Sequence, residues 1–210
     1  MIILSHIKKD YSSRTILNFA HLEIPEGIHW LKGGNGSGKT TLMKIIAGIN
    51  PFDGEVSVDS VNLKSKPIAY RKLVSYAEAE PLFPEFLTGT ELIRFVQQTR
   101  QASNQQVDDL LAHLDIADFI KYPVGTYSSG MLKKLSLLMT FIGDMKLILL
   151  DEPLITIDDE FMPKLLSLIS QRCEAGVSFI ISSHQQLPET HFVCKGVLKI
   201  ENHSANFTLL

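Results

Sequence analysis

An eight-residue segment rich in glycine, GGNGSGKT (33–40), restricts the possible folds of this chain more than any other feature. It follows a short apolar run, Ile28 to Leu31, and precedes a segment with helical spacing, Thr41 to Ala47. Glycines between a strand and a helix let successive main-chain N–H groups point inward, and the helix adds the positive end of its dipole. The segment matches G-x-x-x-x-G-K-[S/T] in full, which predicts a loop that binds phosphates, with Lys39 on the terminal phosphates and Thr40 on Mg²⁺.

Two acidic residues follow the most apolar strand segment of the chain. Leu147 to Leu150 has no polar side chain, which is typical of a strand buried on both faces, and Asp151 and Glu152 come directly after it. Ligands bind at the carboxyl ends of strands in open α/β sheets, and a phosphate-binding loop needs a carboxylate for its metal ion. We therefore predict that Asp151 holds Mg²⁺ and that Glu152 orients and polarises the attacking water. The alternative is an acidic surface turn before Pro153.

Apolar strands alternate with helical segments along most of the chain, which predicts an α/β fold with a mostly parallel sheet. Thr88 to Thr140 differs, because its apolar residues recur every three or four positions and predict helices. A further helix is expected over Phe161 to Ile169, and the last two strand segments predict a closing hairpin. The segments with strand character are 1–7, 15–24, 28–31, 54–58, 73–77, 147–150, 177–181, 197–200 and 206–209.

The motifs occur in an order that resembles the nucleotide-binding subunit of ABC transporters over nearly the whole chain. Tyr11 precedes the phosphate-binding loop, and YAEAEPLF (Tyr76–Phe83) resembles the loop that joins the core to a helical subdomain in that family. Further along the chain, YSSGM (127–131) resembles the family's signature Leu-Ser-Gly-Gly-Gln, and the acidic pair 151–152 follows. TID (156–158) resembles the loop whose aspartate touches the partner subunit, and SSH (182–184) resembles the strand end with the switch histidine.

The resemblance implies a single ABC ATPase domain over residues 1–210. It would have a P-loop NTPase core, an antiparallel β subdomain and a helical subdomain inserted at approximately residues 82–142. It implies ATP and Mg²⁺ as cofactors, with Lys39, Glu152 and His184 in catalysis and Thr40 and Asp151 at the metal. The residues implied to contact nucleotide are Tyr11, Gly33, Gly34, Asn35, Gly36, Ser37, Gly38, Lys39, Thr40, Thr41, Ser128, Ser129 and Gly130.

Three of these assignments have a simpler structural alternative. The family stacks an aromatic ring on adenine where Tyr11 lies, but Tyr11 could equally be a half-buried strand residue. Ser128 precedes a segment with a clear helical stripe, so its hydroxyl could be an ordinary N-cap rather than part of an anion site for the γ-phosphate bound by the other subunit. His184 ends a strand, where a histidine is commonly a polar surface group.

The chain departs from the family pattern in its signature and in the loop that joins the core to the helical subdomain. By register, Ala79 stands where the family has a glutamine that contacts Mg²⁺ and water, and alanine cannot coordinate a metal. A neighbouring glutamate, Glu78 or Glu80, substitutes for it, or coupling is altered. Ser129 replaces the first signature glycine, which adds a Cβ where the backbone approaches phosphate. These changes could lower turnover.

Composition limits the partners and the compartment. The 210-residue chain has a net charge of −3, so it lacks the basic field that draws proteins onto nucleic acid or anionic membranes, and we expect no nucleic acid partner. No apolar run reaches the roughly 18 residues of a spanning helix, so direct membrane insertion is not expected. Cys173 and Cys194 are too few for a disulfide framework and predict a reducing, cytosolic compartment. Six of the seven histidines lack metal-ligand spacing with these cysteines, so we expect no structural zinc. They are His6, His21, His29, His113, His191 and His203.

The resemblance implies Mg²⁺-dependent ATP hydrolysis by a homodimer or heterodimer of ATPase subunits that powers solute transport through a separate membrane permease. The chain would then be cytoplasmic and peripheral on the membrane. Phe83, Phe86 and Leu87, on a proline-stiffened loop, are either core residues or a docking surface for the permease. Two other functions stay open: a soluble non-transport ABC-type ATPase, for example in iron–sulfur assembly, and an ATP-gated clamp with little turnover, which Ala79 and Ser129 favour.

Overall fold

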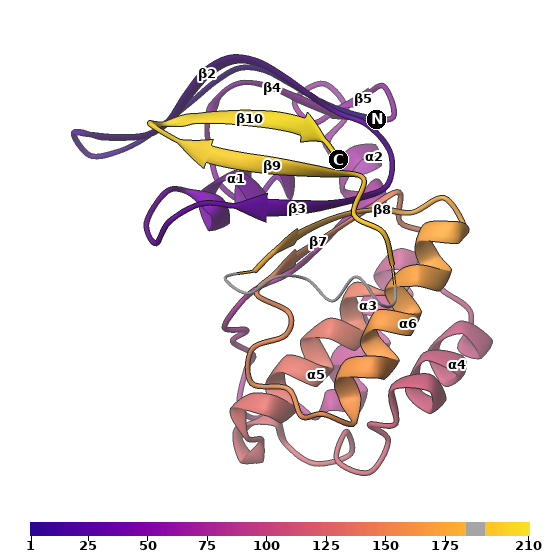
Figure 1. The fold of residues 1–210 in the computed structure, drawn as a ribbon. Helices are drawn as coiled ribbons and strands as arrows, with labels where there is room; N and C mark the ends of the chain where they lie inside the picture. The colour runs from indigo at the N-terminus through magenta and orange to yellow at the C-terminus, as the bar shows by residue number, and fades with distance from the viewer. Residues whose placement is uncertain (184–191) are drawn as a thin grey trace.

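The strands of the protein form two sheets, and most of its helices gather on one side of the larger sheet (Figure 1). The structure, a computed structural model, describes residues 1–183 and 192–210. The smaller sheet has the strand order β2-β1-β4-β5 and is antiparallel throughout. Its strands are β1 (Ile2–Tyr11), β2 (Arg14–Ile24), β4 (Asp53–Val58) and β5 (Val61–Asn62).

The larger sheet is six-stranded, with the order β10-β9-β3-β8-β7-β6. Every neighbouring pair is parallel except β9 and β10, which form the predicted closing hairpin. This mixture of a mostly parallel sheet and an antiparallel sheet confirms the predicted fold class. The strands are β3 (Ile28–Lys32), β6 (Val74–Ala77), β7 (Leu147–Asp151), β8 (Ser178–Ser182), β9 (Gly196–Glu201) and β10 (Ser204–Leu209).

Strand β7 lies at the boundary between two hydrophobic cores. Leu147 and Leu149 belong to the core that also contains α1 (Lys39–Ile46) and the smaller sheet. Ile148 and Leu150 point to the opposite face, because successive side chains alternate along a strand, and they join the core formed by the larger helices. Burial on both faces explains why the segment is uniformly apolar, as predicted.

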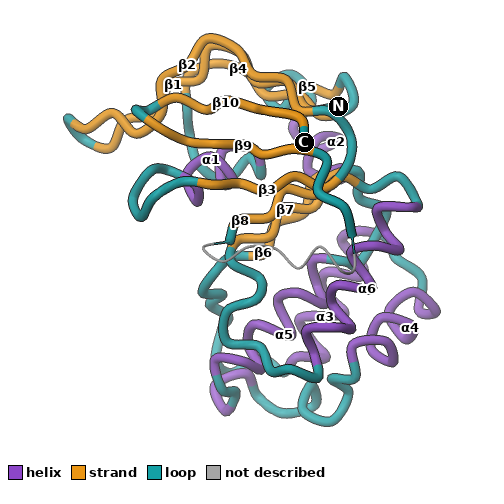
Figure 2. Tube along the Cα trace, in the orientation of Figure 1, coloured by secondary structure: helices purple, strands orange, loops and turns teal. Residues whose placement is uncertain are grey.

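The middle third of the chain is helical, as its periodicity predicts, and Figure 2 shows these helices grouped on one side of the larger sheet. Thr88 caps the first of them, since its hydroxyl accepts from the Glu91 N–H and the Glu91 carboxylate accepts in return from the Thr88 N–H. No helix within residues 1–183 and 192–210 is long and apolar enough to cross a membrane. The helices on this side of the sheet are α3 (Gly89–Arg100), α4 (Asn104–Leu114), α5 (Ser129–Thr140) and α6 (Phe161–Glu174), with a 3₁₀ turn at Val124–Thr126.

One helix was not predicted from the sequence. The polar stretch between the strands at 54–58 and 73–77 contains α2 (Pro67–Leu73), which extends to Leu73 and so shortens the predicted strand to Val74–Ala77. Pro67 occupies the first turn, where its missing N–H is harmless. Tyr70 is the only residue that α2 buries, and its hydroxyl donates to the Ile46 carbonyl at the end of α1 over 2.6 Å. A single buried residue gives no visible periodicity.

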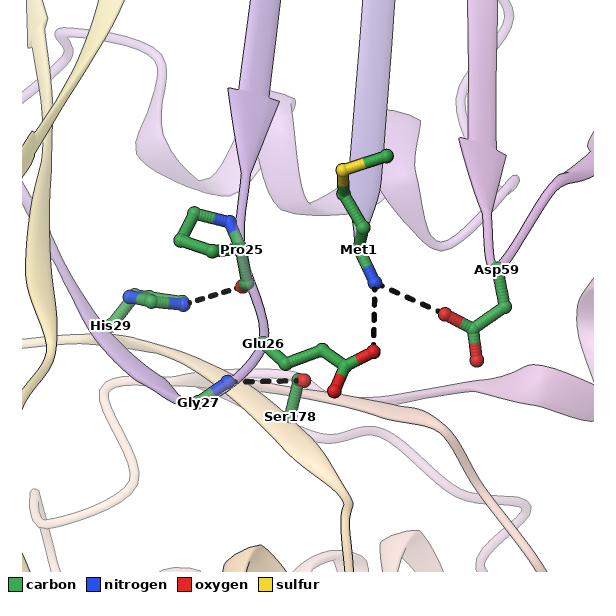
Figure 3. Close-up of polar contacts among 7 residues, drawn as sticks. All are labelled: Met1, Pro25, Glu26, Gly27, His29, Asp59 and Ser178. Atoms are coloured by element: carbon green, nitrogen blue, oxygen red, sulfur yellow. Dashed lines mark hydrogen bonds and ion pairs between the residues drawn. The ribbon is translucent and has the colours of Figure 1, made fainter.

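The turn that leads into β3 is tied to neighbouring elements (Figure 3). Gly27 donates its N–H to Ser178 Oγ at the start of β8 over 3.2 Å. His29 donates from Nε2 to the Pro25 carbonyl over 2.8 Å. The amino group of Met1 pairs with the carboxylates of Glu26 and Asp59, at 3.4 and 3.0 Å. These contacts fix where β3 begins, and therefore where the glycine-rich loop emerges from its other end.

Candidate active site

The glycine-rich loop connects the end of β3 directly to α1, as predicted. Gly38 is the N-cap of α1 and has a φ of 107°, which favours glycine, and a Cβ there would lie 3.0 Å from Ile16 Cγ2. A side chain on Gly33 would overlap Ser37 Oγ. Ser37 Oγ is buried and has no hydrogen-bond partner among the described residues. An unpartnered hydroxyl beside free helix N-terminal N–H groups is suited to an anionic ligand.

Lys39 places its ammonium inside the curve of this loop. Its side chain is largely buried, and Nζ donates to the carbonyls of Gly33 and Gly34 at 2.8 and 3.2 Å. These main-chain acceptors hold the charge at the mouth of the loop, where a phosphate group would meet it. The arrangement fits the predicted role of Lys39 on the terminal phosphates.

Asp151 is the centre of a network of hydroxyl groups at the end of β7. Its Oδ2 accepts from Thr40 Oγ1 at 2.7 Å and from the Tyr76 hydroxyl at 3.2 Å, and its Oδ1 accepts from Ser182 Oγ at 2.5 Å. Burial, together with the charge of Asp151, raises the pKa of Tyr76, so the phenol stays a donor. A carboxylate beside a hydroxyl is an oxygen donor set of the kind that Mg²⁺ prefers, so Thr40 and Asp151 fit the predicted metal site.

Glu152 is buried and its backbone is held in an uncommon conformation. Its φ is 46°, in the left-handed region, which costs a non-glycine residue roughly 1–3 kcal/mol. Its N–H donates to Ser182 Oγ over 3.0 Å. A strained residue that neighbouring groups hold in place is typical of functional sites. The alternative, an acidic surface turn, does not fit because the exposed fractions of Asp151 and Glu152 are 1% and 9%.

A cavity of about 370 Å³ joins the loop and the acids into one site. Ala79, which follows β6, also lines it, but the methyl side chain offers no ligand. Of the two glutamates that could replace the expected glutamine, Glu78 pairs with Lys44 at 3.1 Å. The lining residues are Ile16, Asn35, Gly36, Ser37, Gly38, Lys39, Thr40, Thr41, Ala79, Asp151 and Glu152.

The signature segment lies at the start of α5, and none of its described residues lines this cavity. Ser128 is the N-cap of α5, which is the simpler of its two predicted roles. Its hydroxyl accepts from the Met131 N–H at 3.2 Å. A Cβ on Gly130 would lie 2.9 Å from the Thr156 carbonyl, so this glycine allows the loop after β7 to approach the helix. Ser129 is exposed. Ser128 and Ser129 are therefore accessible to a second molecule, whereas Tyr127 is buried.

Gly33, Gly34 and Tyr11 are also predicted to contact nucleotide, but none of these three residues lines the cavity. The carbonyls of Gly33 and Gly34 accept from Lys39 instead. Tyr11 is 48% exposed at the end of β1, and its hydroxyl accepts from Asn50 Nδ2 at 2.8 Å. Ile16 of β2 lines the cavity instead. The stacking of Tyr11 on adenine stays a prediction. His184 lies outside the described residues.

The sequence did not reveal three polar residues that organise the site. Tyr76 and Ser182 both donate hydrogen bonds to Asp151. The sequence predicts only that they belong to strands, because Asp151 is distant from both along the chain. Lys133 is fully buried beneath the acids, and burial lowers its pKa to about 8. Lys133 shares the face of α5 opposite the predicted apolar stripe with Ser136 and Thr140, so the sequence indicates a polar surface face and gives no sign of its burial.

Comparison with known proteins agrees with this geometry. A profile of the family described as ABC transporter matches residues 17–155. The lantibiotic transport ATP-binding protein SrtF of Streptococcus pyogenes is 31% identical over 186 residues, which cover 88% of this chain and 80% of that protein. The chain belongs to the ABC transporter family. It is a nucleotide-binding subunit of that family and an ATPase, as the resemblance implies.

Other matches extend over nearly the whole of both chains. The cytochrome c biogenesis ATP-binding export protein CcmA of Legionella pneumophila is 30% identical over 191 residues, with 90% of this chain and 94% of that protein covered. A solved structure of the ATP-binding cassette MJ0796, described as a dimeric post-hydrolysis state bound to ADP and Pi, has a TM-score of 0.85. It is 17% identical and covers 100% of this chain and 99% of that one, which shows that this ABC subunit has the ABC ATPase fold.

Proposed function

We propose that this ABC subunit hydrolyses Mg²⁺-ATP and thereby powers the transport of a solute through a separate membrane permease. The observation that carries the proposal is the cavity that joins the GGNGSGKT loop to Asp151 and Glu152. The names of SrtF and CcmA, which describe transport and export, support the transport role. The subunit would work on the cytoplasmic face of the membrane, held there by the permease.

The residues of the cavity divide the chemistry among them. N–H groups of residues 33–38 and of Thr41 bind the phosphates together with Lys39. Thr40 and Asp151 would hold Mg²⁺, which supplies positive charge to neutralise the phosphate oxygens. Glu152 orients the attacking water and accepts its proton, and the buried hydroxyl network around Asp151 holds these acids in place.

We propose that two subunits, identical or different, close around two ATP molecules. The signature residues of one chain lie outside its own cavity, so a second chain's Ser128, Ser129 and Gly130 would complete each site. Helix α5 would then direct its N-terminal end at the γ-phosphate. Residues 82–142 would act as the helical subdomain that carries this signature, and His184 would contact the γ-phosphate after β8.

An ATP-gated clamp with little turnover is the second candidate function, and one observation favours it. Ala79 lines the cavity but cannot ligate a metal or orient water. The exposed Ser129 adds a side chain where the signature meets phosphate. A hydrolysis assay on the purified chain separates the two functions.

The loop after β6 offers a docking surface for the permease. Leu82 and Phe86, four residues apart in this loop, are 89% and 80% exposed. Two large apolar side chains exposed so close together are typical of a surface that binds another protein. Of the residues predicted to be either core or docking surface, Phe83 packs against the helical core and Leu87 is half-buried. The loop therefore presents Leu82 and Phe86 outward while Phe83 anchors it.

The experiment that tests the transport role combines partner capture with charged substitutions. From detergent-solubilised membranes of the native host, the tagged chain should co-purify with a protein that has several predicted spanning helices. Leu82→Asp with Phe86→Asp should abolish that capture, because a charge in an apolar contact costs several kcal/mol or roughly 100-fold in affinity. Hydrolysis by the purified double variant should stay within about threefold of the parent.

A matched control keeps the result specific. Ile68 is 75% exposed on α2, a separate element of the chain, so Ile68→Asp should retain the membrane partner. Retention of the partner by the Leu82/Phe86 variant would contradict the docking surface. Capture of only soluble assembly proteins by the parent chain would favour the non-transport ATPase.

A further inference from the structure

The peptide bond between Asp151 and Glu152 is held from both sides by side chains. Its N–H donates to Ser182 Oγ at 3.0 Å, and its carbonyl oxygen accepts from Lys133 Nζ at 3.0 Å. The plane of this peptide sets the direction in which the Glu152 backbone leaves β7. The left-handed φ of Glu152, 46°, is therefore maintained by two contacts rather than by local preference.

Lys133 reaches this peptide from α5, where it is fully buried. Its ammonium donates to the carbonyls of Glu78 and Ala79, at 2.8 and 3.0 Å, as well as to that of Asp151. An ammonium has three N–H donors, so each has one acceptor and the buried charge is saturated. Because all three acceptors are main-chain groups, the contact does not depend on which side chains occupy those positions.

The three segments that meet at Lys133 belong to different parts of the site. Helix α5 begins with the signature, the loop at Glu78 and Ala79 leads to the exposed Leu82 and Phe86, and β7 ends in the two acids. Ala79 has no side chain that could connect its loop to the water or the metal. The main-chain contact through Lys133 supplies such a connection by another route.

We propose that Lys133 is a positioning residue for hydrolysis, which fixes Glu152 through the Asp151 carbonyl and makes its position depend on the loop at Glu78 and Ala79. The proposal rests on the role of Glu152 proposed above. Lys133 does not line the nucleotide cavity, so its removal should leave nucleotide binding nearly unchanged. It should instead displace Glu152, and small displacements of reacting groups reduce turnover strongly.

The test compares kcat and KM for ATP in the full chain. Lys133→Met keeps the length and removes the donors, and it should lower kcat at least about tenfold while KM changes less than about threefold. Lys133→Gln keeps two N–H donors and should give an intermediate kcat. If Lys133→Met does not fold, the kcat of Lys133→Gln is compared with that of the parent instead. Thr140→Val is the control, because Thr140 is buried on the same helix and, among the described residues, its hydroxyl bonds to the Ser136 carbonyl alone. Its kcat should stay within about twofold.

A second arm asks whether Lys133 acts through Glu152. In a Glu152→Gln background, Lys133→Met should cause no further loss of the residual rate, because the group being positioned is gone. Equal losses in both backgrounds, or a raised KM with an unchanged kcat, would overturn the positioning role. A fully active Glu152→Gln variant would overturn the assignment of Glu152 itself, whereas an inactive one beside an unaffected Lys133→Met variant would overturn only the role of Lys133.

Discussion

Replacing Glu152 with glutamine is expected to reduce ATP hydrolysis by about 100-fold or more while ATP binding stays within about threefold of the parent. The amide keeps the shape of the side chain but cannot take a proton from water. Glu152 is buried at the edge of the cavity, with its backbone fixed by Ser182, so the variant should hold the same conformation. Phosphate release under saturating Mg²⁺-ATP measures the rate, and calorimetric titration measures the affinity.

The control for this prediction is an identical chemical change elsewhere. Glu174 is exposed at the end of α6, far along the chain from the acids, and Glu174→Gln should hydrolyse ATP at the parental rate. If Glu152→Gln retained a rate within about threefold of the parent, another group would have to activate the water. Glu80 would then be the next residue to change, since Glu78 is paired with Lys44.

Replacing Lys39 with alanine is expected to weaken ATP binding about 100-fold. The ammonium is held by two carbonyls of the loop, and it is positioned to pair with phosphate oxygens as a charge-assisted donor. Two such interactions of about 1.4 kcal/mol each correspond to this factor. Titration of ATP into the variant, with thermal unfolding as a check on folding, measures the loss.

Lys44 provides the comparison on the same helix. The substitution Lys44→Ala removes an equal charge from α1. The Lys44 ammonium, however, pairs with Glu78 and does not line the cavity. Lys44→Ala should therefore bind ATP within about threefold of the parent. Equal affinities for Lys39→Ala and the parent would exclude Lys39 as the phosphate-binding cation.

The parts of the fold and site that the sequence predicted are those governed by local patterns. The GGNGSGKT loop joins a strand to a helix because glycines permit the turn, and this requirement is visible in eight residues. The uniform apolar run of β7 predicts a strand with two buried faces, and the acids at its end follow from the need of the loop for a carboxylate. These features are encoded by residues close together in the chain.

The features that the sequence did not reveal depend on contacts between distant segments. Lys133 is 18 residues from Asp151 and 55 from Glu78, and all of its partners are main-chain carbonyls that leave no trace in composition. Tyr76 donates to Asp151 across 75 positions. Helix α2 escaped prediction for a different reason, since one buried tyrosine cannot produce a periodic pattern.

We propose that one cavity binds a nucleoside triphosphate on main-chain N–H groups and Lys39, beside Asp151 and Glu152. A crystal structure of the Glu152→Gln variant with ATP and Mg²⁺ would show whether the nucleotide binds there. We expect triphosphate density along residues 35–41, with the metal between Thr40 and Asp151. Nucleotide density at any other place, or an empty cavity under saturating ATP, would show that this cavity is not the nucleotide site.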